Sequence, residues 1–209
     1  MTISYTVTAD QDAIKEAVSL FEFVGGNTAD ALRIAINKAA PKIRTVASRA
    51  IRDQVRLSAS YVGERLTLTK ATRARLSGAI KAPSRGLLLS HFSTDAAVSG
   101  DKVSWLKPPM VPKKGIRLKI KPIGGTTGAP GIGTNKPFYV LLNNRKNVGI
   151  AARTGVGRKI KVFSGPSLSQ VFSGVRDDVM PQASQEFQAQ LIDAMRYVLV
   201  KKYPPEATA

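Results

Sequence analysis

The sequence predicts an α+β fold: an antiparallel sheet packed against long N-terminal and C-terminal helices, with an extended Gly-rich loop. Two observations predict it. Two long stretches with helical periodicity lie near the ends of the 209-residue chain, and a run of short strand-like patterns lies between them. Hydrophobic residues make up 43% and aromatic residues 6%, so the core should be aliphatic. We expect residues 1–26 to form a strand and a helix, and residues 27–209 to form a single α+β domain.

The N-terminal segment contains two short elements. Residues 3–7 alternate apolar and polar side chains, which indicates a strand. Asp10 or Asp12 then caps a helix that ends at Gly25 and Gly26.

The longest helical pattern follows. Asn27 or Thr28 is a suitable N-cap, and the pattern continues to about residue 57. Pro41 lies inside it and lacks the N–H that the helix needs. We expect a kink rather than a break, because the apolar stripe keeps its phase across Pro41. Residues 60–66 indicate a short helix or a turn.

The middle of the chain has the texture of a sheet. Strand-like patterns occur at 73–81, 87–92, 102–107, 115–122, 137–142 and 148–153. Residues 124–133 are rich in Gly, Pro and Thr and offer no anchoring side chains. We therefore predict a mobile loop at 124–136.

The C-terminal helix is predicted over about 176–202, after a turn at Gly165, Pro166 and Ser167. Asp177 and Asp178 favour its N-terminus because they complement the helix dipole. Pro181 would then fall in the first turn, where proline is tolerated.

Charge is the strongest bulk signal. The chain has 32 Lys and Arg against 14 Asp and Glu, a formal charge of +18. Such a surface faces either nucleic acid or an acidic protein. Two sets of cations are the candidate contacts with DNA or a protein partner. The stripe on the long N-terminal helix consists of Lys38, Lys42, Arg49, Arg52 and Arg56. The second set consists of Lys113, Lys114, Arg117, Lys119 and Lys121. A charged stripe is also what an ordinary solvated helix face presents.

Residues for catalysis or cofactor binding are sparse, so we expect no catalytic, metal or cofactor site and no enzyme. There is no cysteine, and His91 is the single histidine, in a strand-like run where a structural role is expected. The Gly-rich segments 128–133 and 155–159 do not match the GxxxxGK[ST] phosphate-binding loop. Few aromatic residues interleave with the basic clusters, so base stacking is poorly supported.

The chain has no apolar run near the ~20 residues that a membrane span needs, and no signal-peptide pattern. We expect a soluble protein with no membrane contact.

Three ordered segments carry a resemblance to a known family. The first is the long Ala- and Arg-rich helix followed by LTLTKA at 66–71. The second is LSGAIKA at 76–82 leading to LLSHF at 88–92. The third joins FYV at 138–140, VGIAAR at 148–153 and IKVFSGPSLSQVF at 160–172. Together they resemble the phage minor tail protein Z family over residues 30–175. Residues 1–26 lie outside the resemblance, and loop 124–136 looks like an expansion.

The resemblance implies a structural virion protein, made in the host cytoplasm, that completes the head-proximal tail end and supports head–tail joining. It implies a symmetric ring, with six copies expected. It also implies contacts with tail terminator, tail tube or connector proteins, and non-specific contact with genomic DNA is an added expectation. Two alternatives stay open: a basic protein that binds nucleic acid without sequence specificity, and an assembly chaperone absent from the finished particle.

Overall fold

The structure is a computed structural model that describes residues 4–6, 28–95, 111–142, 147–155 and 159–202. It confirms the α+β class: long helices accompany small sheets in which every strand pair is antiparallel. The chain forms two compact units. Unit 1 consists of residues 1–50, 59–83 and 172–209, and unit 2 consists of residues 51–58 and 84–171. The predicted boundary at residue 26 is untested and stays a prediction.

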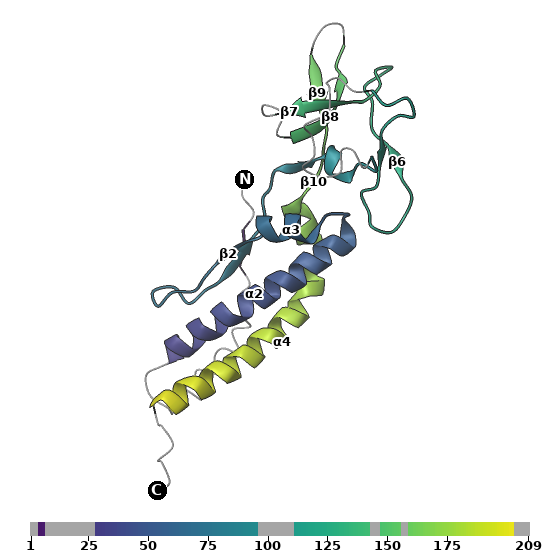
Figure 1. The fold of residues 1–209 in the computed structure, drawn as a ribbon. Helices are drawn as coiled ribbons and strands as arrows, with labels where there is room; N and C mark the ends of the chain where they lie inside the picture. The colour runs from purple at the N-terminus through teal and green to yellow at the C-terminus, as the bar shows by residue number, and fades with distance from the viewer. Residues whose placement is uncertain (1–3, 7–27, 96–110, 143–146, 156–158, 203–209) are drawn as a thin grey trace. The chain divides into compact units, whose positions relative to one another are not determined.

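Unit 1 is built on two long helices that run side by side in opposite directions (Figure 1). Helix α2 covers Thr28–Gln54 and helix α4 covers Leu168–Lys202, with the last turn of α2 and the first residues of α4 assigned to unit 2. The buried stripe of α2 is mostly alanine, including Ala31, Ala35, Ala39 and Ala47. Small side chains let another element approach the helix closely. The buried stripe is aliphatic, as the composition predicted.

Helix α2 is continuous across Pro41, so the proline does not split it. The Thr45 hydroxyl donates to the Pro41 carbonyl at 3.1 Å in the following turn. Continuity agrees with the unbroken phase of the apolar stripe, and the predicted kink stays untested.

Helix α4 starts eight residues earlier than predicted, at Leu168. Ser167 and Gln170 explain its start. The Ser167 hydroxyl accepts from the Gln170 N–H at 3.1 Å, and the Gln170 side chain accepts from the Ser167 N–H at 2.9 Å. This reciprocal pair is a capping box, which satisfies backbone donors at the helix start. The assignment of Asp177 and Asp178 to the N-terminus, and of Pro181 to the first turn, is therefore wrong.

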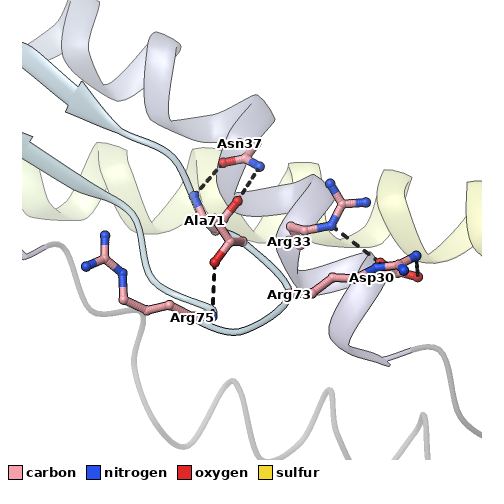
Figure 2. A network of polar contacts seen from close by, with 7 residues as sticks. Asp30, Arg33, Asn37, Ala71, Arg73 and Arg75 are labelled. Carbon is pink, nitrogen blue, oxygen red and sulfur yellow. Dashed lines mark hydrogen bonds and ion pairs between the residues drawn. The ribbon is translucent and has the colours of Figure 1, made fainter.

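The sheet of unit 1 has the order β1–β3–β2, formed by Ser4–Thr6, Ala79–Lys81 and Thr67–Thr69. Its hairpin is fastened to α2 (Figure 2): the Asn37 side chain both donates to the Ala71 carbonyl at 3.0 Å and accepts from the Ala71 N–H at 2.8 Å. A Cβ at Gly78 would lie 2.8 Å from Ile36 Cγ2, so the absence of a side chain lets the hairpin reach the helix. The short helix α3, Ala59–Arg65, confirms the pattern at 60–66.

Asp30 ties the start of α2 to the same hairpin (Figure 2). Its carboxylate accepts two bonds from the Arg73 guanidinium at 3.1 Å and one from Arg33 at 3.4 Å. The Arg73 hydrogen bond is the largest cause that holds the pKa of Asp30 below its ordinary 3.8, and desolvation by burial opposes this shift. An acidic residue in the first helical turn also complements the helix dipole.

The described residues of unit 2 form three small sheets. The largest has the order β7–β8–β9, from Phe138–Leu142, Asn147–Arg153 and Ile160–Val162. Strand β4, Gly86–Leu88, pairs with β10, Ser164–Ser167. Strand β5, Arg117–Leu118, pairs with β6, Thr127–Gly128. A 3₁₀ helix, η1, occupies Leu89–Phe92.

The core of unit 2 joins segments that carry the family resemblance. Phe92 and Ile150 are fully buried, and the Ser90 hydroxyl donates to the Val148 carbonyl at 2.5 Å. A Cβ at Gly165 would lie 3.0 Å from Phe92 and 3.2 Å from Leu89. The GPS segment, residues 165–167, therefore packs tightly against η1. Its glycine gives room for Phe92 and its serine caps α4, which is a physical reason for this motif.

The strand predictions had mixed outcomes. Strands β7 and β8 confirm 137–142 and 148–153, and β1 confirms the centre of 3–7. Only the last three residues of 73–81 and the middle of 115–122 are strands, and 87–92 becomes η1 after Leu88. The turn predicted at 165–167 is wrong, because these residues belong to β10. Strands β2 and β9 were not predicted. The helix at 10–24 and the strand at 102–107 lie outside the described residues.

Candidate interaction surfaces

The predicted stripe is a row of side chains with different surroundings, and its last member, Arg56, lies beyond the end of α2 at Gln54. Lys38, Lys42 and Arg49 belong to unit 1 and are exposed. Lys42 forms an ion pair with Glu186 of α4 at 2.5 Å, so its charge is partly neutralised within unit 1. Arg52 and Arg56 belong to unit 2, where Arg52 is half-buried and Arg56 is exposed. The Arg56 N–H donates to the Ile120 carbonyl at 2.7 Å, which holds this end of the row in place.

The second predicted set lies in unit 2, where part of it lines a groove. The groove has a volume of about 770 Å³ and is lined by residues 111–117, 126–129, 136 and 137. Lys113, Lys114 and Arg117 are in this lining, and Lys136 joins them from the far end of the Gly-rich loop. Lys119 and Lys121 are not in the lining. All four lining cations are exposed, and no acidic or aromatic residue is among the lining residues. We call this feature the β5–β6 groove.

The β5–β6 pair determines what the backbone offers to the groove. Arg117 lies opposite Gly128, and the Ala129 N–H donates to the Ile116 carbonyl at 2.8 Å. Because hydrogen-bonding directions alternate along an antiparallel strand, the Gly128 N–H is directed away from β5. Added at Gly128, a Cβ would meet nothing within 4 Å, and the residue needs no left-handed φ. The fold of the chain therefore gives no reason for glycine at this position.

The Gly-rich loop at 124–136 contains local secondary structure that the sequence did not predict. It contains β6, and Ile132 forms a bridge with Asn135. Just beyond the 124–133 stretch, the Asn135 side chain donates to the Arg153 carbonyl at 3.1 Å and anchors the end of the loop. Its mobility remains a prediction. Lys136 was missed as a candidate because it stands alone in the sequence, 15 residues beyond the Lys121 cluster.

Groups that could perform chemistry are few. His91 is exposed on η1, a 3₁₀ helix in place of the expected strand. Within the described residues, no group of three or more His, Cys, Asp and Glu is placed to hold a metal ion. Segment 128–133 leads into strand β7, and the described part of 155–159 leads into β9, so neither precedes a helix as a phosphate-binding loop does. No helix in the described part of the chain is long and apolar enough to cross a membrane.

Tyr139 and Ser93 form a buried polar pair in unit 2. The two hydroxyl oxygens are 2.8 Å apart, and the Ser93 oxygen also accepts from the Asp95 N–H at 3.1 Å. Burial raises the pKa of Tyr139 above its ordinary 10.0, although its hydrogen bond with Ser93 opposes the shift. Because both hydroxyl groups have hydrogen-bond partners, we interpret the pair as part of the packing of unit 2 rather than as a reactive site.

The described residues thus form long helices and small antiparallel sheets, with cationic side chains on α2 and in the β5–β6 groove. A comparison with protein families identifies the family of the chain. The family model described as prophage minor tail protein Z matches residues 13–202, so the chain belongs to that family of phage minor tail proteins. Comparisons with curated proteins and with solved structures give no match.

The family match extends the resemblance found in the sequence. It begins at residue 13, inside the segment that had shown no similarity, and it continues through α4. A structural role in the phage tail follows from membership of the family.

Proposed function

We propose that the protein completes the head-proximal end of the phage tail and supports the joining of head and tail, as a ring of identical copies. The family match over residues 13–202 carries the proposal, since it makes the chain a minor tail protein. The exposed cations and the Gly-rich loop of unit 2 support a role in contacts. A structural part of a virion needs such surfaces rather than a catalytic cleft.

A ring requires an interface between copies, and the outer edge of β7 is the candidate. Strand β7 is the edge strand of the β7–β8–β9 sheet. The Phe163 N–H donates to the Ile150 carbonyl on the β9 side, and Ile150 lies opposite Tyr139. By alternation, the N–H and C=O groups of Leu141, which is half-buried, are directed outward. No backbone hydrogen bond between described residues covers this edge, which suits addition of a strand from a neighbouring copy.

The edge can be tested with Leu141→Pro. Proline removes an outward N–H but leaves the bonds to β8, which proline at Val140 would break. Leu141→Ala is the matched control, because it shortens the side chain and keeps the N–H. Light scattering after size exclusion should show fewer oligomers for Leu141→Pro only. Equal oligomer formation by both variants would remove β7 from the interface.

The position in the particle can be tested by a reconstruction of purified virions. Density for this protein is expected as a ring at the head-proximal end of the tail. Mass spectrometry of the same particles provides the second readout. A chain absent from finished virions would be an assembly factor, and a chain located elsewhere on the tail would contradict the proposal.

A further inference from the structure

The distribution of charge between the two units is unequal. Unit 2 holds 17 Lys and Arg but only 3 Asp and Glu, a formal charge of +14, whereas unit 1 holds 15 against 11, a formal charge of +4. No acidic residue occurs from residue 102 to residue 176. Most cations of unit 2 therefore have no acidic side chain within the unit to pair with, and binding of an external anion would lower their mutual repulsion.

We infer that the β5–β6 groove binds the phosphate backbone of double-stranded DNA. The inference rests on the proposed function, which places the protein at the joint with the DNA-containing head. The side chains of Lys113, Lys114, Arg117 and Lys136 supply the charge along the groove. The exposed Gly128, with its outward N–H and no side chain, lets a phosphate oxygen reach the backbone.

The lining favours a nucleic acid over an acidic protein. Protein partners are held mainly by aromatic and Arg anchors in well-packed pockets. This groove has no aromatic residue, three of its four cations are lysines, and Thr126, Thr127 and Gly128 contribute small polar groups. Duplex DNA presents a charge about every 1.7 Å of its axis, which matches a row of exposed cations without demanding a fixed register. Nothing in the lining reads bases, so binding should not depend on sequence.

The test compares two variants that lose the same charge. The groove variant carries Lys113→Gln, Lys114→Gln, Arg117→Gln and Lys136→Gln. The control variant carries Lys70→Gln, Arg75→Gln, Arg196→Gln and Lys201→Gln, all exposed in unit 1. Binding of the full chain to a short duplex is measured across a salt series. Loss of four phosphate contacts should reduce the slope of log K against log salt by about 3 to 4, while the control slope changes by less than about 1.

A single-residue pair guards against a folding artefact in the groove variant. Gly128→Asp places a carboxylate in the groove, and Gly125→Asp places one just outside the lining. At both positions a Cβ has open space and φ is not left-handed. Gly128→Asp should weaken duplex binding more than Gly125→Asp, with unchanged unfolding midpoints for both.

Three outcomes would overturn the inference: equal loss in the groove and control variants, no duplex binding by the wild type, or displacement of the duplex by polyglutamate at equal charge concentration. The last would assign the groove to an acidic protein. None of these results bears on the position of the protein in virions, so the proposed function would stand or fall separately.

Discussion

Unit 1 and unit 2 differ in their balance of basic and acidic side chains. In unit 1, basic side chains find partners: Arg33 and Arg73 bond to Asp30, Lys42 bonds to Glu186, and Arg65 lies 3.6 Å over the Tyr61 ring. In unit 2, 17 cations share 3 acids, so internal pairing cannot be the rule. The contrast shows that net charge is less informative than its distribution. In unit 1 several charges pair between elements of the chain, and in unit 2 most cations have no acidic residue of the unit to pair with.

The largest expected effect tests whether unit 1 is held by its apolar core rather than by those ion pairs. Phe187 is buried on α4, and Phe187→Ala should lower the free energy of unfolding by about 3 to 5 kcal/mol. Denaturant unfolding measures the change, with the exposed Gln188→Ala as the control. A loss below about 1 kcal/mol would mean that this helix face is not packed as described.

Unit 2 should be sensitive to added volume at the GPS segment. A Cβ at Gly165 already approaches Phe92 to 3.0 Å, so Gly165→Val should cost about 1 to 3 kcal/mol. Hydrogen exchange should report the loss in β4 and η1 before it reports any in β2 and β3. Gly125→Val is the matched control, because Gly125 belongs to the same unit and a Cβ there meets nothing within 4 Å. Gly63→Val is not suitable, because it would also change helix α3. Uniform loss of protection would contradict separate units.

A smaller effect sharpens the account of the core of unit 2. Tyr139→Phe removes the bond to Ser93 and should cost about 1 kcal/mol at neutral pH. Because burial raises the folded-state pKa of Tyr139, the neutral phenol stabilises the fold below the ordinary pKa of 10.0, and this stability is lost as the pH rises through the folded pKa. The wild type should thus lose more stability than the variant in strong base. Parallel losses measured by thermal unfolding would contradict the buried phenol.

The smallest expected effect concerns the ion pairs that Asp30 forms with Arg33 and Arg73 in unit 1. The folded-state pKa of Asp30 is lowered, so its stabilisation is present above pH 3.8 and is lost as the pH falls through the lowered value. Asp30→Asn should slightly lower the melting temperature at neutral pH and leave it unchanged in strong acid. Asp53→Asn, also on α2 and exposed, is the matched control. An equal shift in both variants would remove the special role of Asp30.

Long elements were predictable from the sequence, and pairings were not. Thirty residues of periodic pattern indicated α2, and apolar strands indicated β7 and β8. The start of α4 was missed because the acidic pair at 177–178 is more conspicuous than the capping box of Ser167 and Gln170. Strands of two to four residues, such as β2 and β6, are too short to show a period.

The groove illustrates the same limit at the level of the site. Lys113, Lys114 and Arg117 were identified from their charge, but a cluster in sequence does not reveal a concave surface. The groove depends on pairing between Arg117 and Gly128, and a Gly-rich segment carries no side-chain pattern that would predict its partner. Lys136 and Gly128 become recognisable only once that pairing is known.

The most direct test of the contrast between the units uses the two charge-matched variants in phage production. A prophage lacking this gene would be complemented with wild type, groove variant or control variant, and infectious particles would be counted. If the cations of the β5–β6 groove serve an external partner, the groove variant should lower the yield by at least about tenfold while the unit 1 control stays near wild type. Equal yields from the two variants would contradict the account.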